Sequence, residues 1–162
     1  MKKLFPCLIG LLILLSVLNL QAQPRIWNLN QIDHAKNSNS EVVKAVIREA
    51  DKNLSATIAT VMDKPLTPAS GDKHDYMSMG RYWWPNPNTK DGLPYIRKDG
   101  VSNPELEKFD RNPLSKMTRS VIILSLAYHL TNNEQYAQKA VKNLKTWFLD
   151  KKTRMNPNMN FG

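Results

Sequence analysis

Apolar residues recur at three- and four-residue steps between Ser38 and about Asp63, a spacing typical of an amphipathic helix. Ser38 and Glu41 have the spacing of a capping box, in which the hydroxyl and the carboxylate each bind an amide of the first turn. Pro65 follows closely and prevents continuation. We therefore predict a first helix over this range, after a polar lead-in from Gln23 to Asn37. Its apolar stripe consists of Val43, Ile47, Ala50, Leu54, Ile58 and Val61.

Two further apolar patterns predict a helical hairpin. The segment from Pro113 to Leu130, with Asn112 as its N-cap, is apolar nearly all round, which is typical of a helix buried on both sides. The segment from Glu134 to Leu149 has apolar residues on one face and lysines on the other. Only Thr131 to Asn133 join them, and so short a connection forces the two helices to run antiparallel.

The segment from Lys64 to Asn112 contains glycines and prolines throughout, so it predicts a long loop with a short turn of helix at about Pro104 to Phe109. Loops beyond about 12–15 residues are uncommon in compact domains and are mostly functional or disordered. Its many aromatic residues disfavour disorder. The stretch from Asp72 to Pro87, which has neither helical nor strand periodicity, joins charged groups to three consecutive aromatics. We expect it to be held by the scaffold and to line a carbohydrate-binding cleft.

The first 22 residues are typical of a secretory signal peptide. Lys2 and Lys3 precede an apolar run from Leu4 to Leu20, and Ala22 is a small residue at the expected cleavage point. An uncleaved membrane anchor is the alternative, but the uninterrupted apolar stretch is shorter than the roughly 20 residues of a spanning helix. Cys7 lies in this peptide, so the mature chain has no cysteine for disulfides, thiol catalysis or metal binding. We predict an exported protein, and the absence of cysteine suits a bacterial periplasm at least as well as animal secretion.

The basic charge of the chain favours anionic partners. The formal net charge is +9, and loss of Lys2 and Lys3 with the signal peptide leaves +7. Acidic polysaccharide, lipid headgroups and nucleic acid are all candidates, and a charge that merely solvates the surface is the alternative. The basic residues form no dense run of the kind found in nucleic-acid-binding arms. Together with export, this distribution favours an acidic glycan over nucleic acid.

A set of short motifs between Ser70 and Gly162 resembles that of one enzyme family. The motifs are Gly71–Ser78, Tyr82–Pro87, Asp91–Gly100, Asn103–Glu105, Tyr136–Ala140, Trp147–Leu149 and Thr153–Asn158. In this combination the chain looks like the N-terminal part of an alginate lyase-like polysaccharide lyase. The resemblance implies an all-α fold built from helical hairpins of an α/α toroid. Residues 23–162 would form an incomplete toroid, with the long aromatic loop between the first and second helices and further helices after Gly162.

The resemblance also implies a reaction. Such enzymes cleave an acidic uronate polymer, here alginate or a glucuronan-like chain, by β-elimination and without a cofactor. The main catalytic groups of the family are an Asn-His pair and a later Arg/Tyr pair. No Asn-His dipeptide occurs in these 162 residues. We therefore expect the chain to supply part of the substrate cleft rather than the chemical centre, and no stable membrane anchor after signal cleavage. Nothing in the sequence indicates the oligomeric state.

The aromatic loop contains residue types suited to binding a uronate. Lys73 and Arg81 can pair with carboxylates, and Tyr82, Trp83 and Trp84 can stack on sugar rings, although we expect one of the two tryptophans to lie in the core. His74 and Tyr76 are the candidates for proton transfer. Asn158 is a candidate substrate contact, with turn formation as the alternative for it and for Asn156. Asp72, His74 and Asp75 could be drawn as metal ligands, but their spacing is unspecific and we predict no metal.

Two other functions stay open at this point. One is a noncatalytic glycan-binding protein that has the cleft wall alone. The other is a glycoside hydrolase on a similar toroid, which needs a pair of acidic residues across the cleft. No pair of carboxylates stands out for that role in the sequence.

Overall fold

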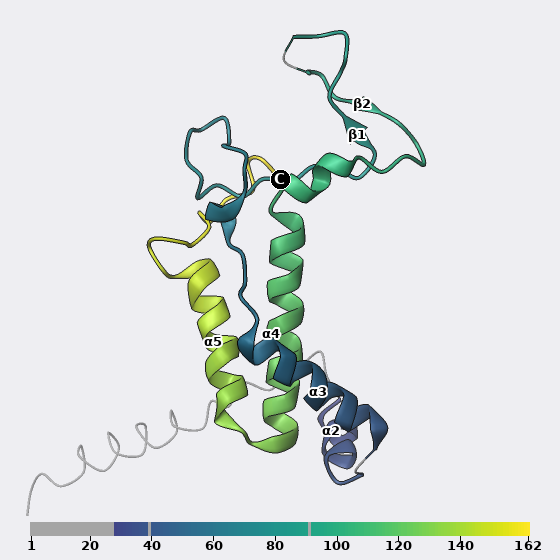
Figure 1. The fold of residues 1–162 in the computed structure, drawn as a ribbon, viewed down its shortest axis with the longest axis vertical. Coiled ribbons are helices and arrows are strands. Elements are labelled where there is room, and N and C mark those ends of the chain that lie inside the picture. Colours follow the sequence, from purple (N-terminus) through teal and green to yellow (C-terminus); the bar gives the residue numbers. More distant parts are fainter. Residues whose placement is uncertain (1–27, 39, 91) are drawn as a thin grey trace, which may run out of the picture. The chain divides into compact units, whose positions relative to one another are not determined.

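The computed structural model describes residues 28–38, 40–90 and 92–162 (Figure 1). The chain divides into two units, residues 1–34 and 35–162. The proposed signal peptide lies outside the described residues, and none of the described helices is long and apolar enough to cross a membrane. The elements are α2 (Leu29–Lys36), α3 (Glu41–Ser55), the 3-10 turn η1 (Val61–Asp63), β1 (Trp83–Trp84), β2 (Ile96–Arg97), the 3-10 turn η2 (Pro104–Lys108), α4 (Arg111–Thr131) and α5 (Glu134–Phe148).

The first predicted helix is wrong at both ends. The lead-in contains helix α2, and α3 begins after Ser40, whose hydroxyl accepts a hydrogen bond from the Val43 amide at 3.3 Å. The helix ends at Ser55 because two backbone carbonyls beyond it bind side chains of α5. Lys139 Nζ donates to the carbonyl oxygen of Ala56 at 2.7 Å, and Trp147 Nε1 donates to that of Ala59 at 3.1 Å. The segment that follows α3 is extended until η1.

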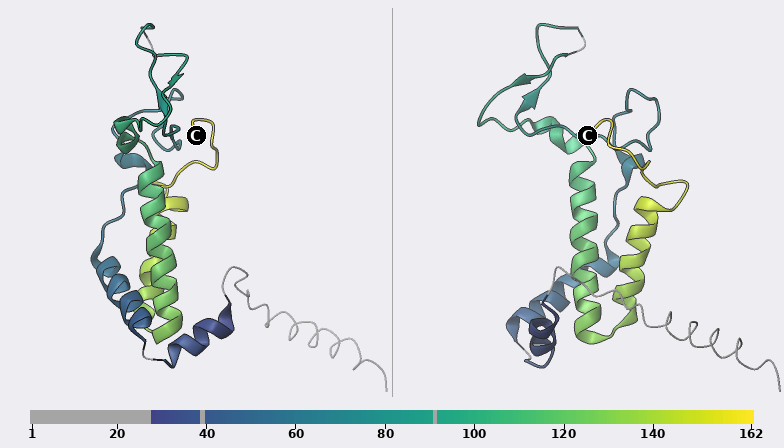
Figure 2. Two further views of the ribbon diagram at one scale, coloured as in Figure 1. Left: turned by 90° about the vertical axis from the view of Figure 1, so that its right-hand side faces the viewer. Right: turned by 180° about the vertical axis from the view of Figure 1, so that it is seen from behind.

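The predicted antiparallel hairpin of α4 and α5 is confirmed, and the two helices lie side by side in Figures 1 and 2. Asn132 adopts the left-handed conformation, with φ of 55°, and its amide donates to the Tyr128 carbonyl at 2.7 Å. Asn133 then caps α5. The predicted start of α4 is wrong by two residues, because Asp110 and not Asn112 precedes the helix. Proline is tolerated at position 113 because the first turn of a helix leaves its amides unbonded.

The core lies where α3, α4 and α5 meet. Leu124 and Ala127 of α4 pack with Ala50 of α3 and with Tyr136 and Ala140 of α5. A second cluster joins Val61, Met117 and Trp147, all nearly inaccessible to solvent. Two polar contacts cross the same interfaces: Tyr136 donates to Asp51 at 2.6 Å, and Asn143 donates to Ser120 at 3.1 Å. These contacts form the scaffold that carries the long loop.

Within the described residues, α4 is covered on one side by α3 and α5, while its outer face carries exposed apolar residues. Ile122 and Tyr128 are exposed on its outer face. An exposed apolar stripe also runs along α5 at Val141, Leu144 and Phe148. The prediction that both sides of α4 are buried stays a prediction, since it relied on further helices after Gly162.

The long loop between α3 and α4 is confirmed, and so is a short helical turn, η2, close to the predicted position. The loop also contains an antiparallel pair of strands that we did not predict. Strand β1 pairs with β2 so that Trp83 faces Arg97 and Trp84 faces Ile96. Because each strand has only two residues, no alternating pattern is long enough to reveal it.

Candidate functional site

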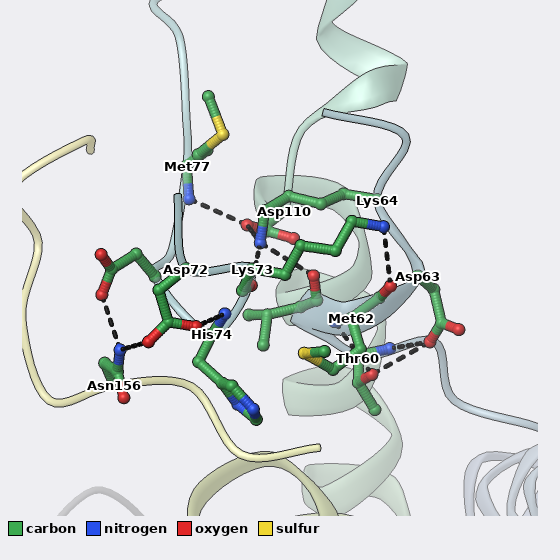
Figure 3. A network of polar contacts seen from close by, with 12 residues as sticks. Thr60, Met62, Asp63, Lys64, Asp72, Lys73, His74, Met77, Asp110 and Asn156 are labelled. Atoms are coloured by element: carbon green, nitrogen blue, oxygen red, sulfur yellow. Dashed lines mark hydrogen bonds and ion pairs between the residues drawn. The ribbon is translucent and has the colours of Figure 1, made fainter. Parts of the chain in front are cut away.

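A buried ion pair anchors the long loop to the start of α4. Lys64 Nζ lies 3.0 Å from Asp110 Oδ2, and the two side chains are 2% and 0% exposed. The same ammonium donates to the carbonyl oxygens of Val61 at 2.8 Å and Lys73 at 2.7 Å. The Met77 amide also donates to Asp110 Oδ2, at 2.8 Å (Figure 3). One lysine and one aspartate therefore join η1, the middle of the loop and the first residues of α4.

The Asp110 carboxylate is only half satisfied. Its Oδ1 atom is buried and has no hydrogen-bond partner among the described residues. Burial raises the pKa of Asp110, while the Met77 amide and the Lys64 ammonium act against the rise. The Met77 amide and the Lys64 ammonium are thus the groups that favour the charged form of this buried carboxylate.

The C-terminal segment is tied to the same loop. Asn156 Nδ2 donates to Asp72 Oδ2 at 2.9 Å and to Asp75 Oδ1 at 2.8 Å. Asn158 Nδ2 donates to Asp75 Oδ1 at 2.9 Å. The Ser78 amide donates to the Phe161 carbonyl at 2.9 Å, within a parallel bridge between Met77 and Phe161. The loop and the tail therefore form one wall, although they are about 80 residues apart in the sequence.

Asp75 accepts three side-chain hydrogen bonds. The bonds from the Ser70 hydroxyl, at 2.6 Å, and from Asn156 and Asn158 lower the pKa of Asp75 to about 2. Both oxygens of this carboxylate therefore accept hydrogen bonds that hold the loop and the tail. Among the described residues, no group of three histidine, cysteine or acidic side chains is placed to hold a metal ion.

His74 is held at three points. Its ring Nδ1 lies 2.6 Å from the carbonyl oxygen of Arg154. Its amide donates to Asp72 Oδ1 at 2.9 Å, and its carbonyl accepts from the Asn156 amide at 2.8 Å. Because a carbonyl oxygen only accepts, Nδ1 carries a proton, and in the neutral ring Nε2 is then the acceptor. The tautomer of His74 is thus set by the tail.

The β1–β2 hairpin presents aromatic rings to solvent. Tyr82, Trp83 and Tyr95 are 37%, 44% and 42% exposed. Trp84 is half-buried: its Nε1 donates to the Val101 carbonyl at 3.2 Å, and Lys98 Nζ lies 4.6 Å from the centre of its ring. The expectation that one of the two tryptophans lies in the core is therefore wrong, because the hairpin places both beside the loop backbone.

Gly80 allows the indole of Trp83 to fold over the chain. A Cβ atom at position 80 would lie 2.4 Å from Trp83 Cδ1, which is too close for any other residue without movement of the ring. Trp83 and Tyr95 also line a small hollow of about 380 Å³, together with Ser78, Met79, Gly80, Pro94 and Gly162. The position of this exposed tryptophan thus depends on a glycine three residues earlier.

A basic groove lies where the loop, η2 and the first half of α4 meet. It has a volume of about 630 Å³ and is lined by four exposed cations, Arg81, Arg111, Lys116 and Arg119. We call these four residues and the hollow between them the basic groove. Its lining includes one carboxylate, Glu107, which accepts a hydrogen bond from Asn112 Nδ2 at 2.9 Å.

The sequence model of the family described as alginate lyase matches residues 60–162. The chain belongs to the alginate lyase family. Among solved structures, it is similar to an alginate lyase from Bacteroides ovatus, with 52% sequence identity and a TM-score of 0.78 over 88% of this chain. The chain spans 39% of the length of that lyase. No curated protein sequence matches it.

Family membership confirms the resemblance and the helical fold class, and the structure shows where the predicted site residues lie. Arg81 is in the basic groove, and Tyr82 and Trp83 are exposed on the hairpin. Lys73 points back to the scaffold, with Nζ 3.4 Å from the Met62 carbonyl. Tyr76 is only 4% exposed. Asn158 is engaged with Asp75 and, through Oδ1, with the Asn160 amide at 3.2 Å, as expected of a turn residue.

Sequence reasoning missed three of the four cations of the groove. Arg111, Lys116 and Arg119 belong to a helix that we described by its apolar residues. Positions 111, 115 and 119 follow one another at four-residue steps and therefore share one face of a helix. The polar residues on that face were the feature of the sequence that could have revealed the groove.

Proposed function

We propose that the chain is part of an exported bacterial lyase that cleaves an acidic uronate polymer, alginate or a glucuronan-like chain, by β-elimination. In this proposal the loop from Asp72 to Pro87 supplies part of the substrate cleft. The observation that carries it is the exposed pair Tyr82 and Trp83 next to Arg81, on a loop anchored by a buried ion pair. Membership of the alginate lyase family supports the reaction class.

The reaction makes three demands on the site. A base removes the proton from C5, the electron pair forms a double bond between C4 and C5, and the bond from C4 to the glycosidic oxygen breaks. The leaving oxygen then takes a proton from an acid. Because negative charge spreads onto the C5 carboxylate in the transition state, that carboxylate must be neutralised by a cation or by hydrogen bonds.

Arg81, Tyr82 and Trp83 suit the binding part of this task. A guanidinium can bind a carboxylate through two parallel hydrogen bonds. Aromatic rings can cover the apolar C–H face of a sugar, and the tyrosine hydroxyl can bind its oxygens. Lys73, Trp84 and Asn158 already make hydrogen bonds within the loop and tail. We assign these three to the same cleft as residues that hold its wall in place.

The two candidates for proton transfer differ in access. The ring of Tyr76 is almost wholly buried, whereas His74 is half-buried and its Nδ1 is held by the Arg154 carbonyl. His74 is therefore the better placed to accept a proton or a hydrogen bond at Nε2. We assign the main catalytic groups to parts of the enzyme outside this chain, since the related lyase is much longer.

The reaction is tested by incubating the gene product that contains this chain with alginate and with glucuronan. The absorbance of the unsaturated product is expected to rise with one or both, and not with a neutral β-glucan. Absence of product from every uronate polymer contradicts the lyase function. Binding of the polymers without any product would favour the noncatalytic alternative.

The cleft role is tested with two exposed aromatic residues. Trp83→Ala is expected to weaken binding of a uronate oligomer several-fold, since aromatic contacts are each worth about 0.5–1.5 kcal/mol. Phe148→Ala is the matched control, because Phe148 is 41% exposed and lies on α5. Titration calorimetry gives both affinities. Equal affinities of the two variants contradict the assignment of the cleft.

A further inference from the structure

The basic groove extends along α4 from the proposed cleft. Arg111, Ser115 and Arg119 lie at successive four-residue steps on one face, and a helix rises about 1.5 Å per residue, so the cations of α4 span about 12 Å. This is longer than one pyranose ring. A ligand that follows the groove would therefore be an oligomer and not a single sugar.

The cations of the groove have no acidic partner within ion-pair distance among the described residues. Within residues 28–38, 40–90 and 92–162, no ion pair joins Arg81, Arg111, Lys116 or Arg119 to a carboxylate. By comparison, Lys44 and Lys52 of α3 pair with glutamates, and Arg97 and Lys108 pair with acidic side chains in the loop. Four like charges around one hollow repel each other, and an anionic ligand would relieve that repulsion.

The other lining residues suit a sugar. Ser102 and Ser115 offer hydroxyls that can donate or accept hydrogen bonds, while Met79, Pro104 and Leu106 provide apolar contact. Carbohydrate rings have the same mixture of polar edges and apolar C–H faces. A purely electrostatic patch, such as one that binds nucleic acid by its phosphates, needs no such apolar lining.

The groove is structurally continuous with the aromatic hairpin. Asn103 is 1% exposed, and its amide donates to the Arg81 carbonyl at 2.9 Å. Its side-chain Nδ2 donates to the Trp83 carbonyl at 2.9 Å. Because Asn103 also lines the groove, this one buried residue fixes the backbone of Arg81 through its amide and that of Trp83 through its side chain. A polymer that lies against Trp83 can therefore continue past Arg81 towards Arg119.

From these observations we infer that the basic groove is a second anionic-sugar subsite, which binds further carboxylates of a uronate polymer through Arg111, Lys116 and Arg119. The inference rests on the proposed function, because it takes the substrate to be a polyuronate. It adds the direction in which the polymer runs and three residues that hold it. The ligand class is a carboxylate-bearing oligosaccharide of several units.

The test compares two double variants that remove the same charge. Lys116→Gln/Arg119→Gln changes the groove, and Lys142→Gln/Lys145→Gln changes exposed lysines of α5. Affinities of the full chain for a uronate disaccharide and for a long uronate oligomer are measured by titration calorimetry. The groove variant is expected to bind the long oligomer about tenfold more weakly, since two charged contacts of about 0.7 kcal/mol each amount to about 1.4 kcal/mol. The disaccharide, held by the aromatic hairpin, is expected to bind both variants equally.

Several outcomes would overturn the inference. If the two double variants lose the same affinity for the long oligomer, net charge and not the groove is responsible. If the groove variant binds the long oligomer like the unchanged chain, no subsite exists there. Tighter binding of single-stranded DNA than of the uronate oligomer would assign the groove to nucleic acid. The lyase assay and the Trp83→Ala measurement do not depend on the groove variants. Failure of the subsite is therefore distinguishable from failure of the proposed function.

Discussion

At the scale of single residues, Asp110 has an unusual position for a carboxylate. It is fully buried, one of its oxygens has no partner among the described residues, and the other is shared by an ammonium and a backbone amide. A buried ion pair is seldom a gain in stability over an apolar pair, but loss of one partner is strongly destabilising. The value of this pair is that it joins segments that share no regular hydrogen-bonding pattern.

Lys64→Met is expected to destabilise the fold by about 3–5 kcal/mol, because it leaves the Asp110 carboxylate buried without a cation. Urea unfolding followed by circular dichroism measures the change. The second substitution Asp110→Asn, in the same chain, removes the uncompensated charge and is expected to restore part of the loss. Lys142→Met is the control on the surface of α5. A Lys64→Met chain as stable as the control would contradict the role of the ion pair.

At the scale of elements, the wall formed by the loop and the tail depends on carboxylates more than on apolar contacts. Asp72 and Asp75 accept hydrogen bonds from the side-chain amides of Asn156 and Asn158. The ring and the backbone of His74 are also hydrogen-bonded to the tail. Both carboxyl groups have a lowered pKa, chiefly because of the hydrogen bonds that they accept. The docking of the tail is therefore expected to depend on pH.

The sign of this dependence follows from Asp75, whose pKa falls from the ordinary value of 3.8 to about 2 in the fold. A lowered pKa means that the folded chain binds the proton less readily than the unfolded chain does. The stability that Asp75 contributes is therefore complete above about pH 4 and lost as the pH falls towards about 2. Asp75→Asn is expected to flatten this part of the profile, as measured by urea midpoints at each pH. Parallel acid profiles of the two chains would contradict this prediction.

At the scale of the whole molecule, the formal net charge of +9 gives the chain a field that favours polyanions. Salt-paired cations on α3 and in the loop contribute little to a specific contact, because a neighbouring carboxylate already balances each of them. The cations of the basic groove have no such partner among the described residues. Arg81, one of these cations, directly precedes the exposed Tyr82 and Trp83 in the loop.

Binding of alginate is therefore expected to weaken steeply with salt. The Debye length shortens from about 30 Å at 0.01 M ionic strength to about 8 Å at 0.15 M, so long-range attraction is largely screened over this range. The affinity, measured by titration calorimetry across it, is expected to fall at least several-fold. Binding that is independent of salt would show that apolar stacking on the hairpin, and not charge, holds the polymer.

Much of the fold follows from local patterns. The apolar stripe and the preceding turn predict α5 to within one residue, because helix periodicity and turn chemistry act over only a few positions. The antiparallel arrangement of α4 and α5 also follows from a local feature, the short connection between them. The aromatic loop was also identified from composition, since glycine and proline exclude long helices and aromatic residues disfavour disorder.

What the sequence did not reveal depends on contacts between distant residues. The end of α3 is set by Lys139 and Trp147, which bind carbonyls more than 80 positions earlier in the chain. The wall also depends on distant residues, because Asp75 binds Asn156. The groove likewise brings Arg81 of the loop together with Arg119 of α4. The sequence by itself determined where the hairpin of α4 and α5 lies and which segment carries aromatic rings. Only the tertiary structure decided which polar groups meet, because such pairings follow from packing and have no local period.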